Sequence, residues 1–210
     1  MSTPAEAQPG HVVLVGHVVL VGMMATGKTT VGEWLAARLG RPFLDSDQLV
    51  EARTGHTVKE LFAGRGEAGF RAEESAALAE SLAAREPVVI AAAGGAVLDP
   101  TNRHLIRQAG AAGGLVVWLR AEPAVLAQRA TSGSHRPLLD DDPLGTLTRL
   151  AAVREPLYRE VADLEIDETG PEGVLTSAQI GERILARVRP AGGVDRSPSG
   201  STPSRSEARP

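Results

Sequence analysis

The sequence predicts an α/β fold with three layers, in which helices cover both faces of a central parallel sheet of about five strands. The candidate strands are continuous apolar runs, which is typical of strands that are buried on both faces. Helical segments alternate with these runs, and this alternation is the pattern of parallel strands joined by crossover helices. We expect one such domain over about residues 17–189.

The elements follow one another without long gaps, and glycines and prolines mark several of their ends. In the first half we predict a strand over Val18–Val21, a helix over about Lys28–Leu39 that stops at Gly40, a short strand over Pro42–Asp45, helical pieces over Gln48–Arg53, Val58–Ala63 and Glu67–Ala84, and a strand over Val88–Ala92. In the second half we predict a helix over about Pro100–Ala109, a strand over Leu115–Leu119, a helix over Pro123–Ala130, a helix over Leu144–Val161 that is interrupted or re-angled near Pro156, a strand over Leu164–Ile166 and a helix over Gly173–Val188.

Three segments are expected to lie outside this regular pattern. The hexapeptide His11–Gly16 is repeated as His17–Gly22, and only the second copy leads into a glycine-rich loop. We therefore interpret residues 1–16 as an N-terminal extension of unknown order. A polar loop over about residues 131–142 has the composition of a mobile lid. Residues 190–210 are rich in Ser, Pro, Gly and Arg, a composition that predicts a disordered tail.

Composition restricts the classes of partner. With 22 basic and 26 acidic residues and a net charge of −4, the chain has no bulk attraction for nucleic acids or anionic membranes. It has no cysteine, which excludes disulfides and thiolate metal sites, and its five histidines form no metal-binding pattern. The first ten residues lack the basic region of a signal peptide. We expect a cytoplasmic monomer that binds a small molecule.

The strongest motif is the segment Gly22-Met-Met-Ala-Thr-Gly-Lys28-Thr29, which fits G-x-x-x-x-G-K-[ST] at every fixed position. It lies after a buried strand and before a helix, where backbone N–H groups point at phosphate oxygens. Lys28 is expected to reach the β- and γ-phosphates, and the Thr29 hydroxyl to ligate Mg²⁺. The motif predicts a P-loop NTPase fold that binds nucleotide phosphates with Mg²⁺, but alone it names no substrate. The expected ATP-binding residues are Gly22, Met23, Met24, Ala25, Thr26, Gly27, Lys28, Thr29 and Thr30.

Two carboxylates follow the second predicted strand, in Phe43-Leu-Asp45-Ser-Asp47. Ligands bind beyond the carboxyl ends of the strands in open parallel sheets. Asp45 is a candidate for holding Mg²⁺ through water, and Asp47 for binding and deprotonating a substrate hydroxyl. The alternative is that Asp45 or Ser46 caps the next helix.

Further motifs occur in an order and rough spacing that resemble the shikimate kinase family, from about Val18 to Val188. They are Asp45-Ser-Asp47, Glu51-Ala-Arg53-Thr-Gly55, Glu60-Leu-Phe62, Gly66-Glu-Ala-Gly-Phe70-Arg71, Ala93-Gly94-Gly95-Ala-Val97, Arg136-Pro-Leu-Leu139 and Arg154-Glu-Pro-Leu-Tyr158. The resemblance implies a P-loop fold like that of the nucleoside monophosphate kinases and ATP-dependent phosphorylation of the 3-hydroxyl of shikimate.

The resemblance also implies roles for individual residues. Those implied to hold the substrate are Asp47, Arg71, Gly94, Gly95 and Arg154. Two Arg forks suit a carboxylate and an Asp suits a ring hydroxyl, so the chemistry agrees. By the same resemblance, Arg129 lies along the adenine and Arg136 closes with the lid over the γ-phosphate. Lys28, Asp47 and Arg136 are the expected catalytic residues, and Thr29 and Asp45 the metal ligands.

The chain departs from the family's pattern in three places. Ala93 stands where the family has a first glycine, Ala25 replaces a glycine of the phosphate loop, and the acidic stretch Glu168–Glu172 stands where the family has a basic adenine loop. Ala93 would face the substrate. It leaves open a kinase for another polyol or cyclitol acid, such as a gluconate-like compound. A non-catalytic nucleotide-binding paralogue is the other alternative.

Overall fold

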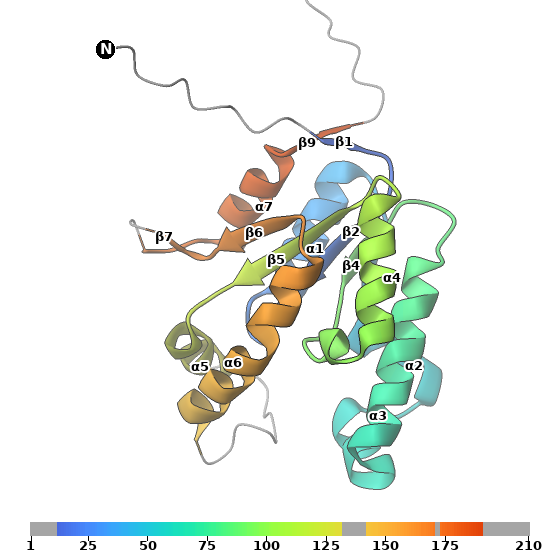
Figure 1. Ribbon diagram of the computed structural model, residues 1–210, viewed down its shortest axis with the longest axis vertical. Helices are drawn as coiled ribbons and strands as arrows, with labels where there is room; N and C mark the ends of the chain where they lie inside the picture. Colours follow the sequence, from blue (N-terminus) through green and yellow to red (C-terminus); the bar gives the residue numbers. More distant parts are fainter. Residues whose placement is uncertain (1–11, 132–141, 171–172, 191–210) are drawn as a thin grey trace, which may run out of the picture.

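The fold is described by a computed structural model that covers residues 12–131, 142–170 and 173–190. Its centre is a parallel sheet of five strands in the order β3-β4-β2-β5-β6 (Figure 1). The strands are β2 (Val18–Val21), β3 (Phe43–Asp45), β4 (Val89–Ala91), β5 (Leu115–Arg120) and β6 (Leu164–Asp167). The predicted strands and their parallel arrangement are confirmed.

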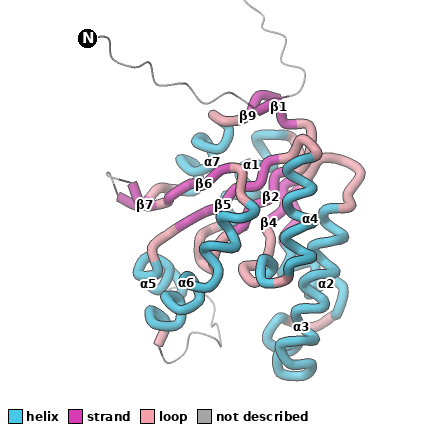
Figure 2. The backbone as a smooth tube through the Cα atoms, viewed as in Figure 1, coloured by secondary structure: helices cyan, strands magenta, loops and turns pink. Residues whose placement is uncertain are grey.

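Helices flank this sheet on both sides, as Figure 2 shows. They are α1 (Lys28–Leu39), α2 (Ser46–Thr54), α3 (Val58–Leu82), the 3₁₀ turn η1 (Ala96–Leu98), α4 (Pro100–Ala111), α5 (Pro123–Thr131), α6 (Pro143–Val161) and α7 (Ser177–Leu185). Within the described ranges, none of them is long and apolar enough to cross a membrane.

Successive residues of the strands point to opposite faces of the sheet, and helices cover both faces. Val19 and Val21 of β2 pack in a cluster with residues of α3, α4, α5 and α6. Val18 and Leu20 pack instead in a cluster with residues of α1 and α7. All four side chains are almost fully buried. This burial explains why the strands are continuous apolar runs in the sequence.

Helix α3 joins the two predicted pieces Val58–Ala63 and Glu67–Ala84, with non-helical backbone angles at Gly66 between them. Two further helices differ from the prediction. Helix α6 runs through Pro156 without the expected interruption. Helix α7 begins at Ser177 rather than at Gly173, because Thr176 and Gln179 form a capping box that fixes its start. The residues before it form a small antiparallel hairpin of β7 (Thr169–Gly170) and β8 (Gly173–Val174).

The first copy of the repeated hexapeptide has a place in the fold. Its residues form β1 (Val12–Leu14), which pairs in parallel with β9 (Val188–Pro190) as a separate two-stranded sheet. Leu14 is buried in the cluster on the α1 and α7 face. This pairing ties the start of the described chain to its end. The predicted disordered tail over 190–210 lies, apart from Pro190, outside the described residues.

Candidate active site

The P-loop lies between β2 and α1, at the carboxyl end of the sheet. Gly22 and Gly27 have positive φ angles of 144° and 74°, which glycine adopts most readily. A Cβ atom on Gly22 would lie 2.4 Å from the carbonyl oxygen of Leu119. The Lys28 ammonium group donates to the carbonyls of Gly22 at 2.9 Å and Met23 at 2.8 Å. Lys28 therefore folds back over the loop, and its charge lies at the predicted phosphate site.

Ala25 is the strained residue of this loop. Its φ of 64° is the one positive φ angle among the described non-glycine residues. The left-handed conformation costs an L-residue roughly 1–2 kcal/mol, because Cβ crowds the following carbonyl. Ala93, the other departure from the glycine pattern, has no such angle. Alanine in place of glycine therefore strains the backbone at position 25, in the phosphate loop, but not at position 93.

Replacing Ala25 with glycine is expected to raise the free energy of unfolding by about 0.5–1 kcal/mol. The relieved strain of roughly 1–2 kcal/mol exceeds the roughly 0.4–1 kcal/mol by which glycine stabilises the unfolded chain. Urea denaturation measures the change. The matched control is Ala37→Gly, at an exposed position of α1, which should lower stability by about 1 kcal/mol. Equal destabilisation by both substitutions would contradict the strain at Ala25.

Asp45 caps the next helix, which is the alternative that the sequence offered for it, and its second carboxylate oxygen faces Thr29. One carboxylate oxygen accepts from the backbone N–H groups of Asp47 at 2.9 Å and Gln48 at 3.4 Å, so it caps α2. The other accepts from the Thr29 hydroxyl at 2.8 Å. The two predicted metal ligands are therefore adjacent, at the carboxyl end of β3 and the start of α1.

A second group of charged residues surrounds Arg71 of α3. Its Nη1 donates to both carboxylate oxygens of Glu74, at 3.0 and 2.8 Å. Burial raises the pKa of the Glu74 carboxyl and the charge of Asp47 raises it further, whereas Arg71 and Arg154 lower it. A Cβ on Gly95 would lie 2.0 Å from Nη1 of Arg71. The fold thus brings the predicted substrate-binding residues together around Glu74.

Sequence reasoning did not single out Glu74. Its side chain is only 3% exposed, and it holds Arg71 from one turn further along α3. The i, i+3 spacing of an acidic and a basic residue was a signal that could have found it. Many such pairs are solvated, however, and the burial that distinguishes this one depends on the packing of α3.

The carbonyl of Gly94 is held by two side chains of α6. The Tyr158 hydroxyl donates to it at 2.6 Å and Nη1 of Arg154 at 3.3 Å. Burial raises the pKa of Tyr158, so its hydroxyl remains a donor. Arg154 is only 5% exposed. These contacts fix the loop after β4 against α6 and place the Arg154 guanidinium beside the glycine pair.

Arg129 connects α5 to the P-loop. Its Nη1 donates to the Ala25 carbonyl at 3.0 Å and to Glu168 Oε2 at 2.6 Å. Thr30, another predicted ATP-binding residue, is exposed on the first turn of α1. Arg136 and the predicted lid, apart from its end residues Thr131 and Asp142, lie outside the described residues.

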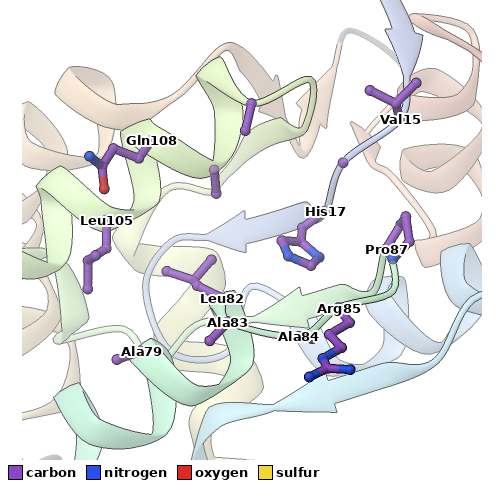
Figure 3. Close-up of a pocket in the computed structure, with 13 residues that line it drawn as sticks. Val15, His17, Ala79, Leu82, Ala83, Ala84, Arg85, Pro87, Leu105 and Gln108 are labelled. Atoms are coloured by element: carbon purple, nitrogen blue, oxygen red, sulfur yellow. The ribbon is translucent and has the colours of Figure 1, made fainter.

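A separate pocket of about 400 Å³ lies near the amino ends of the strands, whereas the P-loop lies at their carboxyl ends. Its lining includes His17, which precedes β2, Leu82 at the end of α3 and Leu105 of α4, all labelled in Figure 3. The phosphate loop follows the other end of β2. This pocket is therefore distant along β2 from the predicted chemistry and is not the candidate active site.

Comparison with known proteins agrees with this geometry. The family described as shikimate kinase matches residues 24–188. A shikimate kinase of Symbiobacterium thermophilum is 51% identical over 84% of this chain and 97% of its own. A shikimate kinase from Acinetobacter baumannii, solved in complex with shikimate, has a TM-score of 0.74 and 40% identity, covering 81% of this chain and 91% of its own.

A gluconokinase from Sinorhizobium meliloti also superimposes, with a TM-score of 0.55 over 83% of this chain and 91% of its own. At 24% identity, it shares the fold alone. The family model matches residues 24–188, and a relative is 51% identical over most of both chains, so the family of this chain is shown. This chain is a kinase and belongs to the shikimate kinase family.

Proposed function

We propose that the chain transfers the γ-phosphate of ATP to the 3-hydroxyl of shikimate, and that the residues around Glu74 bind this acceptor. The observation that supports this proposal most directly is that Arg71 and Arg154 lie at the glycine pair Gly94–Gly95. The charge of Asp47 acts on Glu74, the partner of Arg71. Two guanidinium groups suit a carboxylate and an aspartate suits a hydroxyl. The relative from Acinetobacter baumannii was solved with shikimate, which supports the same acceptor here.

On the nucleotide side, the P-loop would hold the phosphates of ATP. Lys28 already lies over the loop carbonyls, and small movements of its ammonium group would bring it to the β- and γ-phosphates. Thr29 and Asp45 offer two adjacent oxygen donors. Mg²⁺ takes few protein ligands and completes its octahedron with phosphates and water, so this pair fits it. When bound, the ion would offset negative charge on the phosphates.

On the acceptor side, each residue has a separate task. Arg71 and Arg154 would hold the carboxylate, Arg71 being oriented by Glu74 and Arg154 lying beside the Gly94 carbonyl. Asp47 would orient the reacting hydroxyl and accept its proton as the oxygen attacks phosphorus. We further propose that Arg136 completes the site over the γ-phosphate, as the family's pattern implies. These groups act by positioning and charge, which dominate catalysis of phosphoryl transfer.

The rival acceptor is a gluconate-like acid, for which Ala93 was the best support in the sequence. The backbone conformation weakens that support. Ala93 has no positive φ angle, so its methyl group is tolerated without strain. Its side chain is buried, and its carbonyl accepts from the Ala96 backbone at 3.0 Å, which fixes the loop in a turn.

The test measures wild type and Ala93→Gly with shikimate and with gluconate at saturating ATP. We expect efficient turnover of shikimate by the wild type, and a change of no more than about threefold in kcat/KM on substitution, because only backbone freedom changes. A gain of tenfold or more on shikimate, equal to about 1.4 kcal/mol, would show that the methyl group excludes it. Absence of phosphotransfer to every acceptor would favour the non-catalytic paralogue.

A further inference from the structure

A buried carboxylate that the proposed mechanism does not use lies at the carboxyl end of the sheet, where the P-loop also lies. Glu168 follows β6 and is 0% exposed. Its backbone is fixed on both sides, since its N–H donates to the Arg120 carbonyl at 2.8 Å and its carbonyl accepts from Leu175 N–H at 2.8 Å. Its side chain is directed to Arg129, at 2.6 Å. The acidic stretch Glu168–Glu172, which stands where the family has a basic adenine loop, therefore begins with a residue whose backbone is fixed and whose side chain points inward.

This ion pair is poorly built for stabilising the fold. The second carboxylate oxygen of Glu168 is buried and has no hydrogen-bond partner among the described residues. Burial raises the pKa of the Glu168 carboxyl, although Arg129 and Lys28 act in the opposite direction. A buried ion pair that leaves a polar atom unsatisfied contributes little stability compared with a neutral group of the same shape. A function other than stability is therefore indicated.

The geometry of Arg129 indicates that function. The same Nη1 atom contacts Glu168 and the carbonyl of Ala25, the strained residue of the P-loop. The Arg129 side chain is 32% exposed, so a ligand can reach it while Glu168 holds it from the protein interior. A planar guanidinium fixed in this way at the edge of a phosphate loop is well placed to stack on a flat base.

We propose that Glu168 is a positioning residue for the nucleotide, which holds the Arg129 guanidinium against the P-loop before ATP binds. This inference rests on the proposed function. An arginine held in one place loses little conformational entropy on binding, and ordering such a side chain otherwise weakens affinity by a few-fold to about tenfold. Glu168 thus compensates within this chain for the missing basic loop.

The experiment compares Glu168→Gln, Arg129→Ala and the double variant. Glu168→Gln should raise KM for ATP and Kd for ADP about three- to tenfold, with kcat and KM for shikimate within twofold of wild type. Calorimetry with ADP gives a readout independent of turnover. The double variant should match Arg129→Ala alone, since the two side chains act as one unit.

The matched control is Glu165→Gln on the same strand, which removes an equal charge from an exposed side chain and should leave KM for ATP unchanged. If Glu168→Gln does not fold, Arg129→Lys breaks the contact from its partly exposed side and should raise KM for ATP similarly. Unchanged or tighter ADP binding in these variants, or additive effects in the double variant, would overturn the inference alone. A wild type that neither binds ADP nor transfers phosphate would overturn the proposed function as well.

Discussion

Replacement of Lys28 by alanine is expected to lower kcat/KM by about a hundred- to a thousandfold or more, while the fold remains intact. The magnitude is that of removing one preorganised group that stabilises charge in a transition state. The Lys28 ammonium group donates to two loop carbonyls, at 2.9 and 2.8 Å, so its charge already lies at the phosphate loop. Loss of these hydrogen bonds should lower stability by only about 1 kcal/mol each or less, since water can replace the donor.

A coupled assay with ATP and shikimate measures this loss, and circular dichroism with a thermal scan checks the fold. The chain offers a matched control, because it has only one other lysine, Lys59. Lys59 is exposed on α3, and Lys59→Ala removes the same charge without touching the loop. Its activity should stay within twofold of wild type. Near-normal turnover by Lys28→Ala would contradict the assignment of the phosphate site.

The phosphate loop and the positions of the strands along the chain could be predicted because their causes are local. The fixed positions of the P-loop motif lie within eight residues, and the apolar runs record burial on both faces of the sheet. The helix over Lys28–Leu39 was predicted with its observed ends, since the loop precedes it and Gly40 ends it with a φ of 63°. Such features need no knowledge of contacts between distant segments.

The remaining features depend on contacts that the sequence does not display. Glu168 looks like part of a solvated acidic turn, and only the fold shows that it is buried against Arg129 of α5. The strain at Ala25 required the backbone angle, because the general motif tolerates any residue there. Glu74 became significant only when α3 placed it among the charges of Asp47, Arg71 and Arg154.

Asp47 combines two properties that a base for the acceptor hydroxyl needs. It lies in the first turn of α2 and is exposed, so a substrate can reach it. Its charge acts on Glu74, which places it near the guanidinium groups proposed to hold the carboxylate. An acceptor anchored by Arg71 and Arg154 would therefore have a carboxylate near it that can accept a proton.

Replacing Asp47 with asparagine is expected to lower kcat about 10²- to 10⁴-fold, the usual contribution of a positioned general base. The amide keeps the shape of the side chain and a hydrogen bond to the hydroxyl, so KM for shikimate should rise less than tenfold and KM for ATP should not change. Stability should fall by only about 0.3–1 kcal/mol, the value of an acidic residue in the first turn of a helix.

The control is Glu51→Gln. Glu51 is an exposed carboxylate of the same helix, and its oxygen accepts from Val58 N–H at 3.2 Å, a bond that glutamine can preserve. Steady-state kinetics on both variants decide the matter. A loss confined to KM would show that Asp47 binds the acceptor without taking its proton, because removing a general base must slow the chemical step itself.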